Sequence, residues 1–392
     1  MGKNLIIIHG GGPTAVINSS LYGAIREAQA SSEVERIYVS IGGTGGLLKK
    51  KVRDVTGMPD EALRGLLSSP SSAIGTSRDA LEAPEYEAMV SILQQLGIRY
   101  VLMNGGNGTM DTCGKLQQHC AGTDIRVIGI PKTMDNDLAV TDHAPGFGSA
   151  ARYMAGSIAE ICCDAAGLPI HIVVVEALGR NAGWVTAAAS LASDSYGCGP
   201  DLIYLPERAF SEEAFLRDVQ RLIDEKGYGV VVASEGLHDA NGQPIVEPVF
   251  KVGRSTYFGD VSSHLAQLIT KKLHYKARSE KPGLLGRASI AWQSEVDRDE
   301  AEACGRAAVQ AAVAGETGKM VAIRRISNEP YASETFLTDI REVMMTERTM
   351  PEEFINESGN GVTEAYKSWV RPLLGSPLPR LIDLRDEESD LC

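Results

Sequence analysis

LIIIHGGGPTAVIN, residues 5–18, joins a short apolar run to a glycine turn and then to an amphipathic helical pattern. The apolar run 5–8 is typical of a buried strand, and the helical pattern extends from about residue 15 to residue 30. Backbone N–H groups at such a turn, together with the positive end of the helix dipole, can bind an anion. Because the glycines are not spaced G-x-G-x-x-G, this motif alone leaves phosphate binding and tight packing equally open.

The order of strand, glycine turn and helix repeats along the chain. Further strand-like runs lie at 37–41, 100–103, 126–130, 170–175, 202–205 and 229–233. Helical patterns lie at 109–120, 147–164, 181–192, 211–226, 259–275 and 297–315. This alternation predicts an α/β fold, with a mostly parallel sheet and helices on both of its faces. Ligands of such sheets bind beyond the carboxyl ends of the strands, where these glycine turns fall.

Composition excludes several classes of protein. The chain has 392 residues and a net charge of −13, from 38 Lys and Arg against 51 Asp and Glu. This charge argues against non-specific attraction to nucleic acid or to an acidic membrane. No apolar run approaches the roughly 18 residues that span a bilayer, and the run 5–8 is too short for the core of a signal sequence. The 7 cysteines have no C-x-x-C spacing, which disfavours a disulfide framework or a zinc site and favours a reducing cytoplasm.

Two further glycine or Asx-rich turns carry groups suited to phosphate chemistry. In the first, residues 103–111, Asn107 and Thr109 offer oxygens toward a phosphate-bound magnesium ion, or alternatively cap the helix that follows. In the second, residues 129–137, Lys132 can neutralise a transferring phosphoryl group and Asp135 can accept a proton from an attacking hydroxyl. Asp137 could bind magnesium directly or through water. Three such loops at successive strand ends favour phosphoryl transfer over a purely structural role.

The combined motifs resemble the phosphofructokinase family over residues 3 to about 325. The motifs are G-G-x-P-x-x-x-I-N at Gly11–Asn18, G-T-S-R at Gly75–Arg78, G-G-N-G-T at Gly105–Thr109, P-K-T-M-D-N-D at Pro131–Asp137 and E-A-L-G-R at Glu176–Arg180. NAD and diacylglycerol kinases share G-G-x-G-T but lack the T-x-D-N-D and G-R motifs.

The resemblance implies two Rossmann-like, mostly parallel sheets with helices on both faces. It assigns residues 1–140, completed by segments from about 255–392, to a larger domain that binds the phosphoryl donor. Residues 141–255 would form a smaller domain that binds the sugar phosphate, and residues 375–392 a polar tail. We expect the acidic run 383–390 to be a solvated end.

The resemblance also implies roles for single residues. Asp135 would be the catalytic base, supported by Thr133, while Lys132 and Arg78 would neutralise the moving phosphoryl group. The donor would bind at Gly12, Arg78, Gly106, Asn107, Gly108 and Thr109, and Mg²⁺ at Asn107 and Asp137. The sugar phosphate would bind at Thr133, Asp135, Leu178, Gly179, Arg180, Glu235 and Arg287.

The activity implied by the resemblance is the Mg²⁺-dependent transfer of a phosphoryl group to the 1-hydroxyl of fructose 6-phosphate, a step of glycolysis. Two positions disagree about the donor. Gly108 resembles ATP users, because diphosphate users carry an aspartate there that repels the nucleotide. Lys132 resembles the diphosphate branch. We weight Gly108 more, so ATP leads and diphosphate is the alternative.

The acceptor and the assembly leave alternatives open. Leu178, Leu284 and His171 depart from residues usual in the family, so sedoheptulose 7-phosphate or another ketose phosphate remains a candidate acceptor. The same departures motivate a remote alternative, a non-catalytic sugar-phosphate sensor. An oxidoreductase that uses the first glycine turn for a dinucleotide would leave the Lys132–Asp137 cluster unexplained.

The resemblance also bears on assembly. Family members of this length are dimers or tetramers, so we expect a homo-oligomer.

Overall fold

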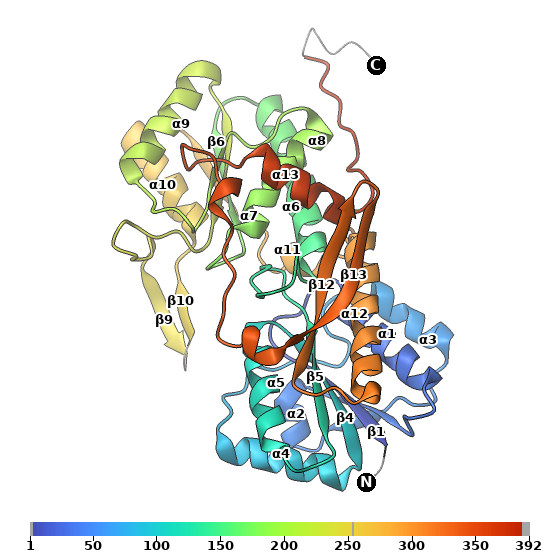
Figure 1. Ribbon diagram of the computed structural model, residues 1–392. Coiled ribbons are helices and arrows are strands. Elements are labelled where there is room, and N and C mark those ends of the chain that lie inside the picture. Colours follow the sequence, from blue (N-terminus) through green and yellow to red (C-terminus); the bar gives the residue numbers. More distant parts are fainter. Residues whose placement is uncertain (1–2, 253–254, 386–392) are drawn as a thin grey trace. The chain divides into compact units, whose positions relative to one another are not determined.

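The computed structural model describes residues 3–252 and 255–385 and divides the chain into two compact units (Figure 1). The first unit consists of Met1–Ser149 and Arg287–Arg348, and the second of Ala150–Gly286 and Thr349–Cys392. These boundaries differ from those expected from the sequence, because all of 255–286 and the chain after residue 348 belong to the second unit. The chain therefore leaves and re-enters each unit.

The elements of the first unit alternate between strands and helices. They are β1 (Asn4–His9), α1 (Ile17–Ala30), β2 (Ile37–Ser40), α2 (Gly43–Leu48), β3 (Val52–Asp54), α3 (Asp60–Arg64), η1 (Gly65–Ser68), α4 (Ala83–Gln95), β4 (Ile98–Gly105), α5 (Asn107–His119), β5 (Arg126–Pro131), α12 (Glu295–Ala314), β12 (Lys319–Asn328), β13 (Tyr331–Asp339) and η3 (Ile340–Glu342).

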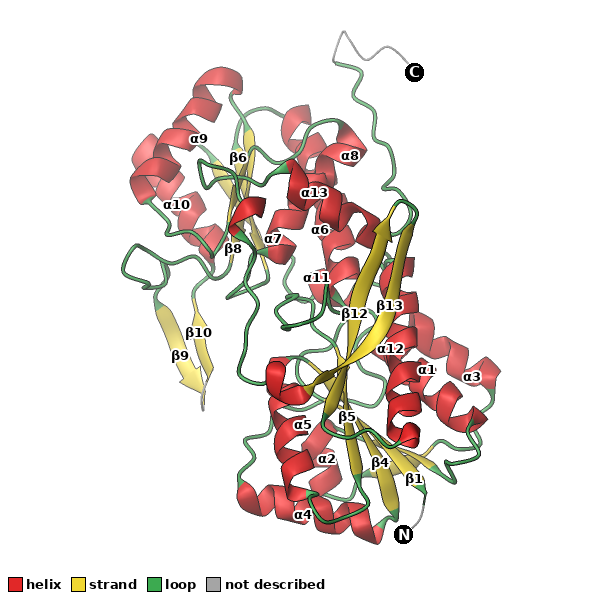
Figure 2. Ribbon diagram, in the orientation of Figure 1, coloured by secondary structure: helices red, strands yellow, loops and turns green. Residues whose placement is uncertain are grey.

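These strands form a sheet of order β13-β12-β5-β4-β1-β2-β3. Its pairs are parallel except at the two edges, where β2 pairs with β3 and β12 with β13 in antiparallel fashion. Side chains alternate along each strand between two hydrophobic clusters. In β1, Leu5 and Ile7 pack with residues of α1 and α12, whereas Ile6 and Ile8 pack with residues of α4 and α5. Helices therefore cover both faces (Figure 2), and the predicted fold class is confirmed.

The second unit contains a smaller sheet. Its elements are α6 (Phe147–Gly167, which begins just before the boundary), β6 (Ile172–Ala177), α7 (Trp184–Ala188), η2 (Ala189–Ala192), α8 (Ser193–Tyr196), β7 (Leu202–Tyr204), α9 (Glu212–Lys226), β8 (Gly229–Ser234), β9 (Pro248–Val252), β10 (Ser255–Phe258), α10 (Val261–Leu273), β11 (Ala277–Glu280), α11 (Leu285–Ala288, which ends in the first unit), η4 (Glu352–Phe354), α13 (Glu364–Val370) and η5 (Arg371–Leu374).

The strand order of this sheet is β11-β6-β8-β7, with every pair parallel. One hydrophobic cluster joins residues of α9 and α10 to the sheet. This packing explains why α10 and β11 belong here rather than to the first unit: β11 pairs with β6, and Leu265 and Ile269 of α10 are fully buried in this core. Strands β9 and β10 form a separate antiparallel hairpin.

The polar tail is held against the second unit as far as the structure describes it. The backbone N–H of Leu381 donates to the carbonyl of Ser195 at 2.8 Å. The hydroxyl of Tyr196 donates to Asp383, and Arg385 donates to the carbonyl of Ala166. Within the acidic run expected to be a solvated end, Asp383 and Arg385 therefore contact the second unit, whereas Leu384 is 88% exposed and 386–392 lie outside the described residues. Among the described helices, none has both the length and the apolar character needed to cross a bilayer.

Candidate active site

Three polar loops meet at one edge of the large sheet. The strands β5, β4 and β1 are neighbours and run parallel, so their carboxyl ends lie side by side. The loops that follow them carry Gly10–Gly12, Gly105–Asn107 and Lys132–Asp137. The backbone connects them directly, since Gly10 N–H donates to the carbonyl of Asn104 at 2.9 Å and Lys132 N–H to the carbonyl of Gly105 at 3.0 Å.

Thr109 explains the glycines of the first two loops. A Cβ atom added at Gly10 would lie 2.3 Å from Thr109 Oγ1, and one added at Gly105 would lie 2.1 Å from the same atom. The buried Thr109 side chain therefore fills the space that both glycines leave open. Thr109, which the sequence analysis assigned to the donor, serves at least to pack the two loops together.

Three cationic side chains surround Gly11 and Gly12. The Lys132 ammonium donates to the carbonyl of Gly12, and its Nζ lies 3.7 Å from where a Cβ of Gly11 would be. A Cβ at Gly12 would lie 2.7 Å from Arg287 Nη1 and 3.6 Å from Arg78 Nη2. Arg287 was expected to hold the sugar 6-phosphate, yet the structure places it in the first unit with the donor loop. Concentrated positive charge at a glycine turn is a site for a polyanion.

Burial and charge set the protonation of Lys132. Burial lowers the pKa of its ammonium to about 8, and the neighbouring guanidinium groups of Arg287 and Arg78 lower it as well. The carboxylates of Asp135 and Asp137 act in the opposite direction. A bound polyphosphate would favour the charged form of Lys132, because an opposite charge at close range raises the pKa of an ammonium.

The turn Thr133–Asp137 presents two carboxylates in different settings. Asp137 accepts a hydrogen bond from Thr133 Oγ1 at 2.9 Å through one oxygen and from Asn107 Nδ2 at 2.9 Å through the other. Asp135 is half-buried, and its backbone N–H donates to Thr133 Oγ1 at 3.1 Å. The structure therefore brings Lys132, Thr133, Asp135, Asp137 and Asn107 together, as the sequence analysis expected.

The pair of Asp137 and Asn107 suits a hard cation. Asn107 Oδ1 is buried and has no hydrogen-bond partner among the described residues, and it belongs to the amide group that contacts the Asp137 carboxylate. Mg²⁺ prefers oxygen ligands and is typically bound by one or two carboxylates together with substrate phosphates. Within residues 3–252 and 255–385 there is no cluster of at least three His, Cys, Asp or Glu side chains that could hold a metal by itself. These residues therefore fit an ion that is shared with a phosphate ligand.

The second group of predicted residues lies in the second unit. Gly179 and Arg180 follow β6, and Glu235 follows β8. The Gly179 N–H donates to Glu235 Oε1 at 3.2 Å, and Ser234 Oγ donates to the Gly179 carbonyl at 2.7 Å. A pocket of about 350 Å³ is lined by Arg180, Asn181, Pro206, Glu235, Gly236, His238, Gly242, Pro244 and Phe258. It offers a cation and a carboxylate to a small polar ligand.

Some predicted or discussed positions are not in this pocket. Leu178 is half-buried and is not among the residues that line it. His171 is 2% exposed within its unit, and burial lowers its pKa, which favours a neutral ring. Leu284 is exposed.

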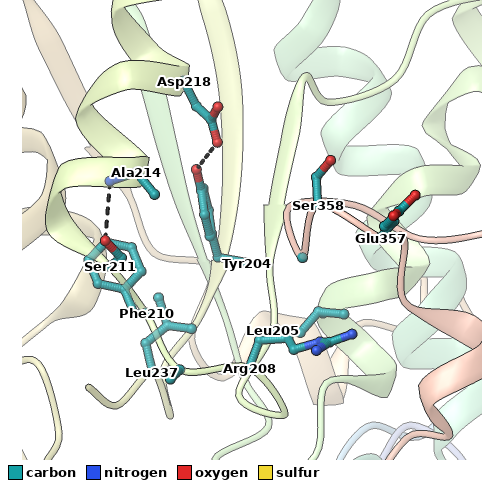
Figure 3. A pocket seen from close by; sticks show the side chains of 12 residues that line it. Tyr204, Leu205, Arg208, Phe210, Ser211, Ala214, Asp218, Leu237, Glu357 and Ser358 are labelled. Carbon is teal, nitrogen blue, oxygen red and sulfur yellow. Dashed lines mark hydrogen bonds between the residues drawn. The ribbon is translucent and has the colours of Figure 1, made fainter. Parts of the chain in front are cut away.

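Another pocket of the second unit, of about 320 Å³, contains none of the predicted site residues (Figure 3). Tyr204 points toward Asp218, and its hydroxyl donates to that carboxylate at 3.0 Å. Ser211 accepts a hydrogen bond from the Ala214 N–H at 3.2 Å and so caps α9. Arg208, Glu357 and Ser358 also line this pocket, for which we propose no role in the reaction.

Sequence reasoning missed two residues near the three loops. His9 ends β1 and is fully buried, and its Nδ1 forms a hydrogen bond with Ser72 Oγ at 2.8 Å. Burial lowers the pKa of His9 to about 3, so its ring is neutral. Arg348 N–H donates to the Asp137 carbonyl at 2.8 Å. His9 adjoins the glycine motif and could have been noticed, whereas no local pattern marks an arginine so far along the chain.

Comparisons with known proteins identify relatives along nearly the whole chain. The family model described as "Phosphofructokinase" matches residues 4–348. A pyrophosphate–fructose 6-phosphate 1-phosphotransferase of Rhodospirillum rubrum is 36% identical over 394 residues, which cover 97% of this chain and 96% of the relative. A sulfofructose kinase of Alkalicoccus urumqiensis is 33% identical over 372 residues and covers 94% of both chains.

A solved structure is similar throughout. The crystal structure of a pyrophosphate-dependent phosphofructokinase from Nitrosospira multiformis superimposes with a TM-score of 0.88 and 34% identity, covering 98% of this chain and 95% of the other. With the family match and the three loops around Gly12, this likeness leads to one conclusion: the chain belongs to the phosphofructokinase family and is a phosphotransferase of that type.

Proposed function

We propose that this protein transfers a phosphoryl group from ATP to the 1-hydroxyl of fructose 6-phosphate, giving fructose 1,6-bisphosphate. The observation that carries the proposal is the cluster of Lys132, Arg78 and Arg287 around Gly12, in the same unit as the Asp135 carboxylate. Phosphoryl transfer depends on positioning and positive charge more than on covalent chemistry, and this cluster provides both.

In the proposed step, the C1 hydroxyl oxygen attacks the terminal phosphorus of the donor. The new O–P bond forms while the bridging P–O bond breaks, ADP leaves, and the hydroxyl proton passes to the Asp135 carboxylate. Lys132 and Arg78 neutralise the charge on the transferring group. Asp137 and Asn107 would hold Mg²⁺, which supplies charge neutralisation at the donor phosphates.

Gly108 supports ATP as the donor. A Cβ at this position would meet nothing within 4 Å, so there is open space at the start of α5, beside Asn107. An aspartate there would fill part of that space with negative charge, and its absence leaves room for a nucleotide. Diphosphate is the second candidate, because the Rhodospirillum and Nitrosospira proteins are named for it and because Lys132 resembles that branch.

The acceptor is proposed to bind at the pocket of Arg180 and Glu235, where a guanidinium can meet an anion and a carboxylate can accept a hydrogen bond from a sugar hydroxyl. Sedoheptulose 7-phosphate is an alternative acceptor. Sulfofructose is another, because the Alkalicoccus relative is named for it. We further propose a cytoplasmic homo-oligomer, a dimer or tetramer, that acts in glycolysis.

The donor is tested by measuring initial rates with fructose 6-phosphate and Mg²⁺, in parallel with ATP and with diphosphate. We expect wild-type protein to use ATP. Gly108→Asp should fold, because its side chain enters open space, and should lose activity with ATP by a factor of about 10² or more. Gly108→Asn is the matched control, since it adds nearly the same volume without charge. Wild-type activity with diphosphate alone would overturn the choice of ATP.

A further inference from the structure

The catalytic turn belongs to a closed loop, residues 131–146, that follows β5. Its two ends meet where Thr133 N–H donates to the Pro145 carbonyl at 3.1 Å. Inside it, Asn136 has a left-handed backbone with φ of 55°, and its Oδ1 accepts a hydrogen bond from Ala144 N–H at 3.0 Å. Asn136 lies between the two carboxylates of the proposed site, so its backbone sets the direction of both.

Arg348 contacts four carbonyl groups of this loop. Its backbone N–H donates to the Asp137 carbonyl at 2.8 Å, and Nε donates to the Asn136 carbonyl at 3.3 Å. Nη1 donates to the carbonyls of Thr141 at 2.5 Å and Asp142 at 2.7 Å. One side chain therefore joins the turn that carries the carboxylates to the returning half of the same loop. The neighbouring residue, Glu347, forms a bridge with Leu138 and adds to this attachment.

The planar guanidinium suits this role better than other cations. It donates in several fixed directions at once, whereas a lysine ammonium is a compact point charge that cannot span carbonyls on both sides of a loop. Burial lowers the pKa of Arg348 to about 10, against the opposing effect of Asp142 and Asp137, so the group stays charged near pH 7.

We propose that Arg348 is a positioning residue that fixes the Asp135–Asp137 turn in its reactive geometry. This inference rests on the proposed function, in which Asp135 accepts a proton and Asp137 binds Mg²⁺. Arg348 donates hydrogen bonds to backbone carbonyls of the loop, so we place its effect on the reaction in the position of the two carboxylates. A displacement of about 1 Å at a reacting group can cost a factor of about 10² in rate.

The kinetic test compares Arg348→Met and Arg348→Lys with Arg341→Met. Arg341 is the matched control, because it is an arginine of the same segment whose side chain is 79% exposed and pairs with Asp339. We expect Arg348→Met to lower kcat by about 10² while KM for the sugar phosphate changes less than about threefold, and to raise the Mg²⁺ concentration needed for half-maximal rate. Arg348→Lys should recover part of kcat, and Arg341→Met should match wild type. Unchanged kcat in Arg348→Met would overturn the inference.

Hydrogen exchange provides a readout that does not depend on turnover. Amides of 134–145 should exchange at least about tenfold faster in Arg348→Met than in wild type, while the core strand β4 and the Arg341→Met control stay unchanged. If wild-type protein shows no turnover, the proposed function fails and exchange still decides whether Arg348 holds the loop. If Arg348→Met fails to fold, the same comparison uses Arg348→Lys. Equal exchange of the loop in wild type and variant would refute the role of Arg348.

Discussion

Gly12→Ala should separate catalysis from folding. Gly12 lacks the positive φ that makes a side chain strained, so the substitution adds only a methyl group to the loop. That methyl would lie 2.7 Å from Arg287 Nη1. Ordinary contact is about 3.5 Å, so the end of the Arg287 side chain must withdraw by about 0.8 Å. The guanidinium is the far end of a flexible chain and can move without disturbing the core.

The expected effect follows from this displacement. A shift approaching 1 Å in a charged group of the site corresponds to a rate loss of about 10², or about 2.7 kcal/mol of transition-state stabilisation. The stability of the fold should change by less than about 1 kcal/mol, since replacing glycine by alanine at a compatible φ restricts the unfolded chain. Initial rates at saturating sugar phosphate and a thermal unfolding curve measure the two effects.

Gly11→Ala is the control, because it should lower the stability of the fold rather than displace a cationic side chain. Its φ of 74° is left-handed, while its Cβ would lie 3.7 Å from Lys132 Nζ and meet no clash. The left-handed conformation costs about 1–2 kcal/mol for a residue with a Cβ, so this variant should lose stability. If Gly12→Ala retained the wild-type kcat and the wild-type KM for the donor, the assignment of Arg287 to the cationic cluster would be refuted.

Three further predictions concern protons. Asp135→Asn should keep sugar-phosphate binding, measured by calorimetry, and lower kcat by about 10² to 10⁴; a variant with most of its rate would remove Asp135 as the base. Because burial lowers the pKa of Lys132 to about 8, kcat/KM for the donor should fall above pH 8, and Lys132→Arg should shift that fall upward, whereas identical profiles would contradict the role of its charge. Burial opposes protonation of His143, but Glu300 and Asp142 outweigh it and raise its pKa to about 9. This ion pairing should add on the order of 3 kcal/mol to the free energy of unfolding, fully present below pH 6.5 and lost as the pH rises through 9. Urea unfolding at a series of pH values measures it, and Glu300→Gln should flatten the dependence of the free energy of unfolding on pH.

Local sequence patterns were sufficient to predict the three loops at the edge of the large sheet. Each loop follows a short apolar strand and carries its glycines, Lys132 or Asp135 within a few residues of the strand end. In a parallel sheet the carboxyl ends of adjacent strands lie together, so neighbouring motifs in a predicted sheet become neighbours in space. These local patterns, together with the resemblance to the phosphofructokinase family, therefore predicted that Lys132, Thr133, Asp135, Asp137 and Asn107 lie close together.

Contacts between segments that lie far apart in the sequence could not be predicted in this way. Arg287 reaches Gly12, and Arg348 reaches the Asn136 carbonyl from 212 residues away. Such contacts depend on where the chain re-enters a unit, and neither periodicity nor composition near an arginine records that. The same limit explains why the expected domain boundaries differ from those of the structure. The sequence placed α10 in the first unit, because no local pattern shows that Leu265 and Ile269 pack on the smaller sheet.

The most direct test of the account is a ³¹P NMR spectrum of the products formed by wild-type protein from fructose 6-phosphate, Mg²⁺ and ATP. The account predicts equal amounts of ADP and fructose 1,6-bisphosphate, with the new phosphate on the C1 oxygen. Product formed only when diphosphate replaces ATP would contradict the donor, and a phosphate placed elsewhere on the sugar would contradict the role of Asp135. Binding without any product, from either donor, would contradict phosphoryl transfer itself and support the sensor alternative.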